Sequence, residues 1–318
     1  MVEMIAVVIP SYRVKNHILE VISGIGNEVH KIYVVDDKCP EESGLYVQQH
    51  CKDNRVEVIF HDKNKGVGGA VKTGYRKALA DQCDIVVKID GDGQMDTALI
   101  PKFIQPILSG EADYVKGNRF FSLSSLSKMP ALRVFGNSML SVINKFVNGY
   151  WNVMDPTNGY TAIHKTALSL LELDKIADTY FFESDMLFRL GTLRAVVLDM
   201  PMFAKYEDEK SSMKISRILF QFPPKYINRF FKRLFYNYFL RDFNAGTVEL
   251  IFGSLFFIFG VIEGFYHWFL SIESQIAATS GTVMLAALPT ILGFQLLISG
   301  LQYDIRNIPI KPLQKLSL

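Results

Sequence analysis

The chain has 318 residues, enough for one large domain or two, and 49% of them are hydrophobic while 21% are charged. The mean hydropathy of +0.16 is high for a water-soluble protein, which indicates that part of the chain lies in a membrane. A formal net charge of +2 excludes the polycation expected of a nucleic-acid coat, so we expect no nucleic-acid partner. Three cysteines without CxxC spacing exclude a disulfide scaffold or a zinc ribbon and indicate a reducing compartment.

The first two hundred residues alternate short β-branched runs with longer segments of helical pattern. The first apolar run has no preceding basic residues and ends at Pro10, so we expect a buried strand and not a signal peptide. The predicted strands are residues 5–10, 31–37, 56–60, 85–90, 114–116 and 195–199, with helices at 16–24, 68–81 and 132–147 among them. Strands that are apolar on both faces predict an α/β fold, with a mostly parallel sheet between helices.

A basic segment without acidic residues follows, at residues 210–241. The pair Pro223 and Pro224 predicts a break into two short helices, since proline removes a backbone donor. In the second helix, apolar residues from Ile227 to Tyr238 fall at helical spacing on one side. We expect this amphipathic segment to lie in the headgroup region, with its aromatic residues in the bilayer and its cations on anionic lipid.

Two long apolar runs near the C-terminus, residues 247–270 and 276–301, are each long enough to cross a hydrocarbon core of roughly 30 Å. The segment between them has no basic residue, whereas the flanking segments are rich in lysine and arginine. By the positive-inside rule we expect an integral protein of the cell inner or plasma membrane, with both termini and the α/β domain in the cytoplasm.

Candidate binding residues lie at the ends of the first two predicted strands, with Pro10 and Tyr12 at one and Asp37 at the other. Open α/β sheets bind ligands at the carboxyl ends of their strands, where an acid can accept hydrogen bonds from a base or a ribose. The alternative is turn chemistry, for which paired aspartates are also typical.

A glycine-rich segment beginning Asn64-Lys65-Gly66 opens a predicted helix. A helix start offers backbone amides to a phosphate, and Lys65 would add a cation. Its glycine spacing matches neither a dinucleotide fingerprint nor a P-loop, which argues against a membrane-bound dehydrogenase.

A DxD pattern follows the predicted strand at 85–90, in the stretch Asp90-Gly91-Asp92-Gly93-Gln94. Two carboxylates at a strand end can turn toward one divalent cation, and oxygen ligands suit Mg²⁺ or Mn²⁺ shared with the phosphates of a nucleotide. A loop of solvated acids is the alternative interpretation.

Further downstream, Arg119 and Arg133 could clamp an anionic acceptor bidentately. Asp155 lies in the segment between them and the next polar cluster, Glu183 and Asp185. These last two acids could act as a base or support other groups, and acids that favour a helix start are the alternative.

In this order the motifs resemble those of family 2 glycosyltransferases with a GT-A fold, and within that family the branch of dolichyl-phosphate mannose synthase and bacterial polyprenyl-phosphate glycosyltransferases. The resemblance extends from Ile5 to about Tyr206, and the basic segment and apolar runs extend it over essentially the whole chain. It implies an α/β, Rossmann-like GT-A domain at residues 1–205, amphipathic juxtamembrane helices at 206–244, two transmembrane helices at 245–303 and a cytoplasmic tail at 304–318.

The resemblance also implies roles for the residues named above. With Lys65 and Gly66 added from the glycine-rich helix start, the nucleotide-sugar site would comprise Pro10, Tyr12, Asp37, Lys65, Gly66, Asp90, Gly91 and Gln94. Metal would be held by Asp90 and Asp92, and the acceptor phosphate by Arg119 and Arg133. The catalytic carboxylates would be Asp92, Asp155 and Asp185.

The function expected is transfer of a sugar from a nucleoside diphosphate donor, a UDP-sugar, to polyprenyl phosphate, with Mg²⁺ or Mn²⁺ and with inversion implied by the family. A phosphate acceptor is already an anion near neutral pH, so no strong general base is needed. One alternative is a transferase that extends a lipid-linked saccharide or polysaccharide, with Asp185 or Glu183 as base. Another is a non-enzymatic membrane scaffold that senses nucleotide sugars, and a homo-oligomeric assembly stays open.

Overall fold

The computed structural model describes residues 3–121, 131–202 and 215–316, with side chains except at 131–133 and 215–220. Two compact units are present. Unit 1 comprises residues 1–230 and 309–318, and unit 2 comprises residues 231–308.

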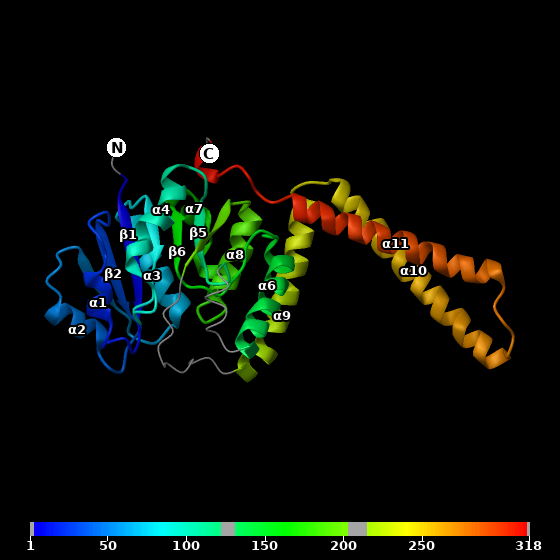
Figure 1. Ribbon diagram of the computed structural model, residues 1–318, viewed down its shortest axis with the longest axis horizontal. Coiled ribbons are helices and arrows are strands. Elements are labelled where there is room, and N and C mark those ends of the chain that lie inside the picture. The colour runs from blue at the N-terminus through cyan, green and yellow to red at the C-terminus, as the bar shows by residue number, and fades with distance from the viewer. Residues whose placement is uncertain (1–2, 122–130, 203–214, 317–318) are drawn as a thin grey trace. The chain divides into compact units, whose positions relative to one another are not determined.

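Unit 1 is built on one mixed sheet, which the described residues form with seven strands in the order β3-β2-β1-β4-β6-β5-β7 (Figure 1). The strands are β1 (Ile5–Ser11), β2 (Lys31–Asp36), β3 (Val56–Phe60), β4 (Ile85–Lys88), β5 (Tyr114–Asn118), β6 (Thr161–His164) and β7 (Val197–Pro201). β6 is antiparallel to both its neighbours, and the other pairs are parallel. The predicted α/β fold with a mostly parallel sheet is therefore confirmed, whereas β6 was not predicted.

Helices cover both faces of the sheet. The helices of unit 1 between β1 and β7 are α1 (Ile18–Ser23), α2 (Ser43–His50), α3 (Val67–Ala80), α4 (Ile100–Leu108), α6 (Ala131–Asn148), α7 (Lys165–Leu170) and α8 (Phe182–Leu193). α1, α2 and α4 pack on the face that carries Ile5 and Ile9 of β1. α3 packs on the opposite face, where a Cβ on Gly74 would lie 2.3 Å from a methyl group of Val8, so only glycine permits this approach.

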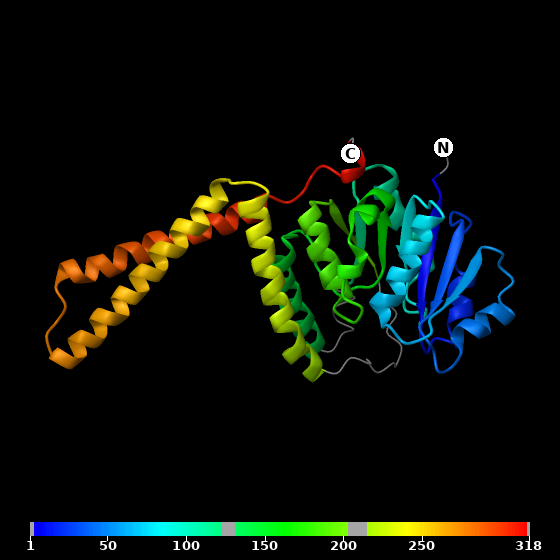
Figure 2. The ribbon, with the colours of Figure 1, turned by 180° about the vertical axis from the view of Figure 1, so that it is seen from behind.

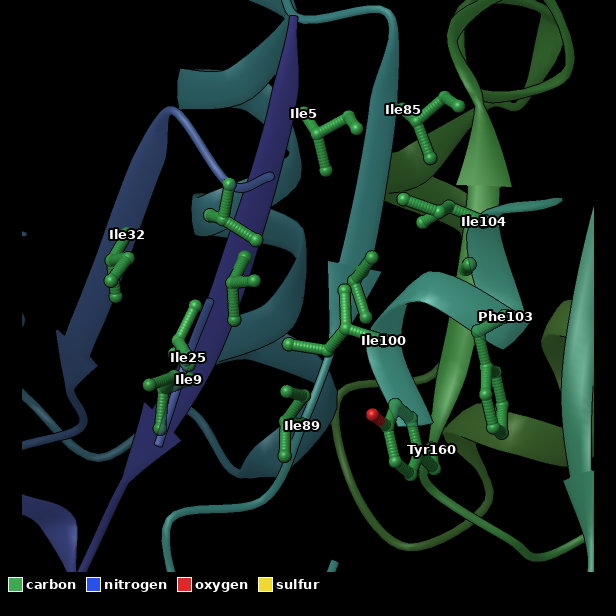
Figure 3. Packing of buried hydrophobic residues seen from close by; sticks show 14 of the residues in the cluster. Ile5, Ile9, Ile25, Ile32, Ile85, Ile89, Ile100, Phe103, Ile104 and Tyr160 are labelled. Atoms are coloured by element: carbon green, nitrogen blue, oxygen red, sulfur yellow. The ribbon is translucent and has the colours of Figure 1, made fainter. Parts of the chain in front are cut away.

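The larger apolar core lies between the sheet and the helices α1, α2 and α4. Figure 3 shows Ile9 of β1, Ile89 directly after β4 and Ile100 at the start of α4 near one another in this core. Phe103 of α4 stacks on Tyr160, with ring centroids 4.0 Å apart. This packing fixes the segment that leads into β6, whose residues close one side of the cleft described below.

α9 (Ile215–Phe235) begins in unit 1 and runs through both Pro223 and Pro224, so the predicted break into two helices is wrong. Each proline removes a helical hydrogen bond, but the residues around the pair are held by tertiary contacts. Phe222 and Tyr226 are buried against Phe181, with ring centroids 5.3 and 5.1 Å from that ring. Figures 1 and 2 show α9 alongside α6, where Asn144 donates a hydrogen bond of 3.0 Å to the Tyr226 hydroxyl.

Unit 2 contains α10 (Ala245–Ser274) and α11 (Ser280–Arg306), preceded by a short π-helical segment, η3 (Tyr236–Leu240). α10 and α11 are long and apolar enough to cross a membrane, in agreement with the two predicted spans. They pack closely at small residues: a Cβ on Gly293 would lie 2.3 Å from the backbone nitrogen of Phe257. Asp304 accepts hydrogen bonds from Arg233 (2.7 Å) and the Tyr238 hydroxyl (2.6 Å), which ties the end of α11 to the segment before α10.

Candidate active site

A cleft of about 580 Å³ opens at the carboxyl ends of β1, β2 and β4, between these strands, the segment before β6 and the start of α8. Its lining residues are Pro10, Ser11, Tyr12, Val14, Asp37, Asn64, Gly66, Val67, Ala70, Lys88, Asp90, Gly91, Asp92, Thr157, Gly159, Thr179, Tyr180 and Glu183. Seven of the predicted site residues are therefore brought together here: Pro10, Tyr12, Asp37, Gly66, Asp90, Gly91 and Asp92.

Residues after β1, which lies between β2 and β4 in the sheet, line part of the cleft. Tyr12 is 43% exposed, and the guanidinium of Arg13 lies 5.5 Å from the centre of its ring. The Ser11 hydroxyl is buried and has no hydrogen-bond partner among the described residues. Since a buried polar group without a partner is costly, this hydroxyl is suited to a ligand that supplies one.

Asp37 organises the neighbouring wall of the cleft. Its carboxylate accepts hydrogen bonds from the backbone amides of Lys65 (2.8 Å) and Gly66 (2.7 Å), and Nδ1 of His61 lies 2.7 Å from Oδ1. The sequence pattern predicted that backbone amides at this helix start could bind a phosphate. In the structure, these two amides bind a protein carboxylate. Gly66 adopts φ +84°, a conformation that favours glycine, so the chain can turn here into α3.

His61 is a structural contributor that the sequence analysis missed. It is buried after β3 and lies between Asp37 and the Thr73 hydroxyl, which is 2.9 Å from Nε2. Its position directly after an apolar strand, at the same sheet edge as Asp37, is the only signal that the sequence offers.

The DxD residues line the cleft after β4, the strand that pairs with β1. Asp92 accepts a hydrogen bond from the backbone amide of Gln94 (3.0 Å), and Oδ1 of Asp90 lies 2.7 Å from Nζ of Lys88. Gln94 itself is not among the lining residues. Lys88, which the sequence analysis did not single out, is buried on β4 and lies 3.6 Å from Oε1 of Glu183.

Lys88 and its acidic neighbours form a buried charged cluster. Although burial opposes its charge, the carboxylates of Asp90 and Glu183 raise the pKa of Lys88, so it is a cation. Burial raises the pKa of Glu183 despite the nearby ammonium. Gly159 permits the close packing, because a Cβ there would lie 2.3 Å from Nζ of Lys88 and 2.7 Å from Oδ2 of Asp90.

These residues fit a divalent metal that keeps open coordination positions. Asp90 and Asp92 offer carboxylate oxygens on one wall of the cleft. Within the described part of the chain, no group of three or more His, Cys, Asp or Glu residues could hold a metal by itself. Mg²⁺ is commonly bound by one or two carboxylates together with water and substrate phosphates, which is the ligand set that this wall could share.

Asp155 and Arg119 pair away from the lining of the cleft. Nε and Nη2 of Arg119 each lie 2.7 Å from one oxygen of Asp155, whose side chain is fully buried. Although burial opposes its ionisation, hydrogen bonds from Arg119 keep the pKa of Asp155 below its usual value. Nζ of Lys116 also donates to the backbone oxygen of Asp155. Asp155 is thus placed to orient Arg119, and Arg133 lies in the first turn of α6 with its side chain outside the described residues.

The two acids at the start of α8 have different surroundings. Glu183 lines the cleft, whereas Asp185 is fully buried and points elsewhere. Asp185 accepts hydrogen bonds from Arg229 of α9 (2.7 and 3.3 Å) and from the backbone amide of Ala177 (2.9 Å). The Ser184 hydroxyl lies 3.1 Å from the Tyr226 hydroxyl, so α9 braces the helix whose first turn forms the cleft wall.

Comparison with known proteins supports the relationship that these motifs suggest. The family model "Glycosyl transferase family 2" matches residues 6–171. The chain is 32% identical over 192 residues to UDP-N-acetylglucosamine–dolichyl-phosphate N-acetylglucosaminyltransferase of Methanococcus voltae, covering 56% of this chain and 76% of that protein. It is 29% identical over 185 residues to undecaprenyl-phosphate mannosyltransferase of Micrococcus luteus, covering 57% and 75%.

Solved structures share the fold. Glucosyl-3-phosphoglycerate synthase from Mycobacterium tuberculosis, crystallised with Mn²⁺, UDP and phosphoglyceric acid, superposes with a TM-score of 0.54 at 18% identity. The match covers 73% of this chain and 78% of that one. The family match spans more than half of the chain and includes the strands that build the cleft, so the protein belongs to glycosyltransferase family 2.

Proposed function

We propose that this protein transfers one sugar from a nucleoside diphosphate donor, a UDP-sugar, to polyprenyl phosphate at the cytoplasmic surface of a membrane. The observation that carries the proposal is the cleft, which combines an exposed aromatic ring at Tyr12 with two carboxylates at Asp90 and Asp92. An aromatic face suits a base, and the two carboxylates suit a metal-bound diphosphate. The relatives named for transfer to dolichyl or undecaprenyl phosphate support the acceptor class.

The donor would lie along the cleft, with its nucleoside near Tyr12 and the Ser11 hydroxyl and its diphosphate near Asp90 and Asp92. A bound Mg²⁺ or Mn²⁺ would neutralise the negative charge of the diphosphate. Lys88 holds Asp90 in place through its contact of 2.7 Å, and Asp37 holds the loop at Gly66. These residues fix the walls of the cleft before the donor binds, which lowers the cost of orienting it.

Arg119 and Arg133 are proposed to bind the acceptor phosphate. Asp155 holds the guanidinium of Arg119 through two hydrogen bonds, so the arginine is ordered before the acceptor arrives. Because the acceptor phosphate is an anion near neutral pH, it can attack the sugar without a protein base. In this mechanism Asp155 positions Arg119, and Asp185 holds α8 against α9.

An exposed apolar face on α6 supports a lipid acceptor. Phe135, Met139, Val142, Ile143 and Phe146 lie at helical spacing on this helix and are 37–66% exposed. Contiguous apolar surface of this kind is unusual on a water-soluble protein and typical of a membrane or partner contact. We propose that α6 and the juxtamembrane segment at 206–244 lie at the membrane surface, while residues 245–303 cross it and both termini stay cytoplasmic.

Glu183 keeps a second candidate function open. It lines the cleft, and burial raises the pKa of its carboxyl, which suits a group that accepts a proton from a sugar hydroxyl. An enzyme that extends a lipid-linked saccharide would need such a base. The proposed phosphate acceptor would not.

The test is mass spectrometry of the lipid products formed by the purified full-length protein in lipid nanodiscs. Polyprenyl phosphate and a lipid-linked monosaccharide are supplied in parallel as acceptors, with a panel of UDP- and GDP-sugars and with Mg²⁺ or Mn²⁺. The proposal expects a polyprenyl phosphate that carries one sugar, from a UDP-sugar. Product formed only from the lipid-linked saccharide would support the second candidate, and no product with any pair would contradict both.

A further inference from the structure

Asp113 is a fully buried carboxylate that the proposed reaction does not use. It directly precedes β5, and its side chain binds two other segments of unit 1. Oδ2 accepts hydrogen bonds from the backbone amides of Val196 (2.8 Å) and Leu313 (2.9 Å), and Oδ1 accepts one from the amide of Gln314 (3.3 Å). A buried charge is stable only when hydrogen bonds replace its hydration, and the C-terminal segment supplies part of them.

The C-terminal segment is docked through side chains as well. It forms a short helical turn, η4 (Leu313–Lys315), in which Leu313 is only 5% exposed. Nε2 of Gln314 donates hydrogen bonds to the backbone oxygens of Ile107 (3.1 Å) and Ala112 (2.9 Å). Figures 1 and 2 show this red segment beside α4 and α7 of unit 1. These contacts distinguish it from a free tail.

The docked segment is one of two connections between unit 1 and unit 2. The chain leaves unit 1 after Phe230 and returns at Pro309, so unit 2 is an insertion with two connections to unit 1. The first connection is α9, whose Phe222 and Tyr226 are buried against Phe181. The second is the segment held by Asp113.

The docked segment lies at the sheet edge opposite the cleft. β5 and β4 are both antiparallel to β6, so they run in the same direction. The cleft lies at the carboxyl end of β4, whereas Asp113 precedes the first residue of β5. With about 3.3 Å per residue, the five residues of β5 separate the two edges by roughly 15 Å. Any effect of the segment on the reaction must therefore come from positioning.

We propose that Asp113 and residues 312–316 form a latch, which holds the second connection between unit 2 and unit 1 against unit 1. With both connections held, unit 1 has less freedom to turn about α9, so its cleft is presented consistently to an acceptor confined to the membrane. Asp113 is thus a positioning residue, since it contacts neither substrate. The inference rests on the proposed function for its kinetic consequence, whereas the docking itself can be measured without activity.

The variant that opens the latch is Leu313→Asp in the full-length protein. It places a second carboxylate at a buried position whose own amide already contacts Asp113, and an unpaired buried charge is strongly unfavourable. The change lies in the tail and leaves the Val196 bond of Asp113 in place. The matched control is Ile310→Ser in the same segment, because that side chain is 90% exposed. Gln314→Ala, which loses only the two side-chain bonds, should give an intermediate result.

Two measurements in lipid nanodiscs test the docking and the freedom of the units. Hydrogen exchange at the amides of Leu313 and Gln314 should be slow in the wild type and in Ile310→Ser, and fast in Leu313→Asp, with exchange in β1 and β4 unchanged. Spin labels at the exposed positions Lys52 and Gln275 should give a broader distance distribution in Leu313→Asp than in the control. Fast exchange of these amides in the wild type, or equal distribution widths, would overturn the latch.

The kinetic measurement tests the consequence for catalysis. In Leu313→Asp we expect the KM for long-chain polyprenyl phosphate to rise on the order of tenfold, since orientation is lost and no substrate contact is removed. The KM for the nucleotide sugar and the rate with a short, water-soluble acceptor should stay at control values. An unchanged KM for the long-chain acceptor with an open latch would refute the positioning role. Failure of the proposed function differs, because the wild type itself would then form no glycosylated lipid.

Discussion

The buried ion pair between Asp185 and Arg229 gives the most direct test of how α9 supports the catalytic unit. Arg229→Ala removes both guanidinium contacts (2.7 and 3.3 Å) from a fully buried carboxylate. Breaking such a pair from one side costs about 3–5 kcal/mol. Arg229 is 22% exposed and Nε of Arg189 remains 3.7 Å from Asp185, so we expect the lower end, about 3 kcal/mol.

The expected loss is large enough to measure as a melting shift. For a domain of this size, about 1 kcal/mol corresponds to roughly 2–4 °C, so Arg229→Ala should lower the Tm of unit 1 by about 6–12 °C. Asp185→Asn should cost less, about 1–2 kcal/mol, because the partly exposed arginine can be hydrated and the amide oxygen can still accept from Ala177. Lys232→Ala, at an exposed position of the same helix, is the matched control.

The assay is intrinsic-fluorescence melting of the full-length protein in detergent, combined with transfer activity well below each Tm. A Tm for Arg229→Ala within about 2 °C of the control, against the expected cost of a broken buried pair, would refute the reasoning. Activity of Asp185→Asn decides between the two roles of this acid. A folded variant that transfers sugar at near wild-type rates supports positioning, whereas a folded but inactive variant supports the catalytic role predicted from the sequence.

Four further predictions concern the cleft and its surroundings. Asp92→Asn should reduce transfer by at least about 100-fold with the Tm unchanged, because it removes a charge that balances the metal at the diphosphate; full activity of the wild type in excess EDTA would contradict this. Arg119→Lys should raise the KM for polyprenyl phosphate by roughly tenfold, the value of one charge-assisted hydrogen bond, and leave the KM for the donor unchanged; the opposite pattern would mean that the roles are misassigned. Gly159→Ala should weaken nucleotide-sugar binding, measured by calorimetry, because its Cβ would lie 2.3 Å from Nζ of Lys88 and displace the partner of Asp90; wild-type affinity would show that the loop adjusts freely. Burial lowers the pKa of His164, so the unfolded chain binds a proton more readily than the folded protein, and stability should fall as the pH drops below about 6.5. The variant His164→Asn can still cap α7, and its Tm should decrease less between pH 7 and pH 5 than that of the wild type. Equal decreases in Tm would exclude this histidine as the cause.

Much of the fold followed from patterns that are local in the chain. Strands such as Ile5–Ser11 and Lys31–Asp36 are apolar on both faces, and this composition predicts central strands of a parallel sheet without knowledge of their partners. The two helices of unit 2 coincide with long, mostly apolar runs, so length and composition alone predicted them. β6 was not predicted because it has only four residues, too few to show a clear periodicity. It is also antiparallel to both its neighbours, and local periodicity does not reveal the direction of a strand.

The candidate site was predictable in part for the same reason. Residues directly after parallel strands meet at one sheet edge, and Tyr12, Asp37, Asp90 and Asp92 do line one cleft there. Lys88 was not predicted as a site residue, because a lysine in an apolar strand belongs to no recognisable sequence motif. Its place in the site is evident only once its carboxylate partners are known. The break at Pro223 and Pro224 was predicted from intrinsic propensity, and tertiary packing of Phe222 and Tyr226 overrode it.

The α/β class, the two apolar helices and the order of polar motifs can be predicted from the chain alone, because hydrophobic periodicity and strand-end residues depend on near neighbours in the chain. The surroundings of the two acids at the start of α8 depend instead on tertiary packing. Glu183 and Asp185 are two residues apart, yet one lines the cleft and the other pairs with Arg229, which is 44 positions away. The direction in which a side chain points depends on its helix turn and on distant packing partners, and so does the docking of Leu313 on Asp113 across 200 residues of sequence.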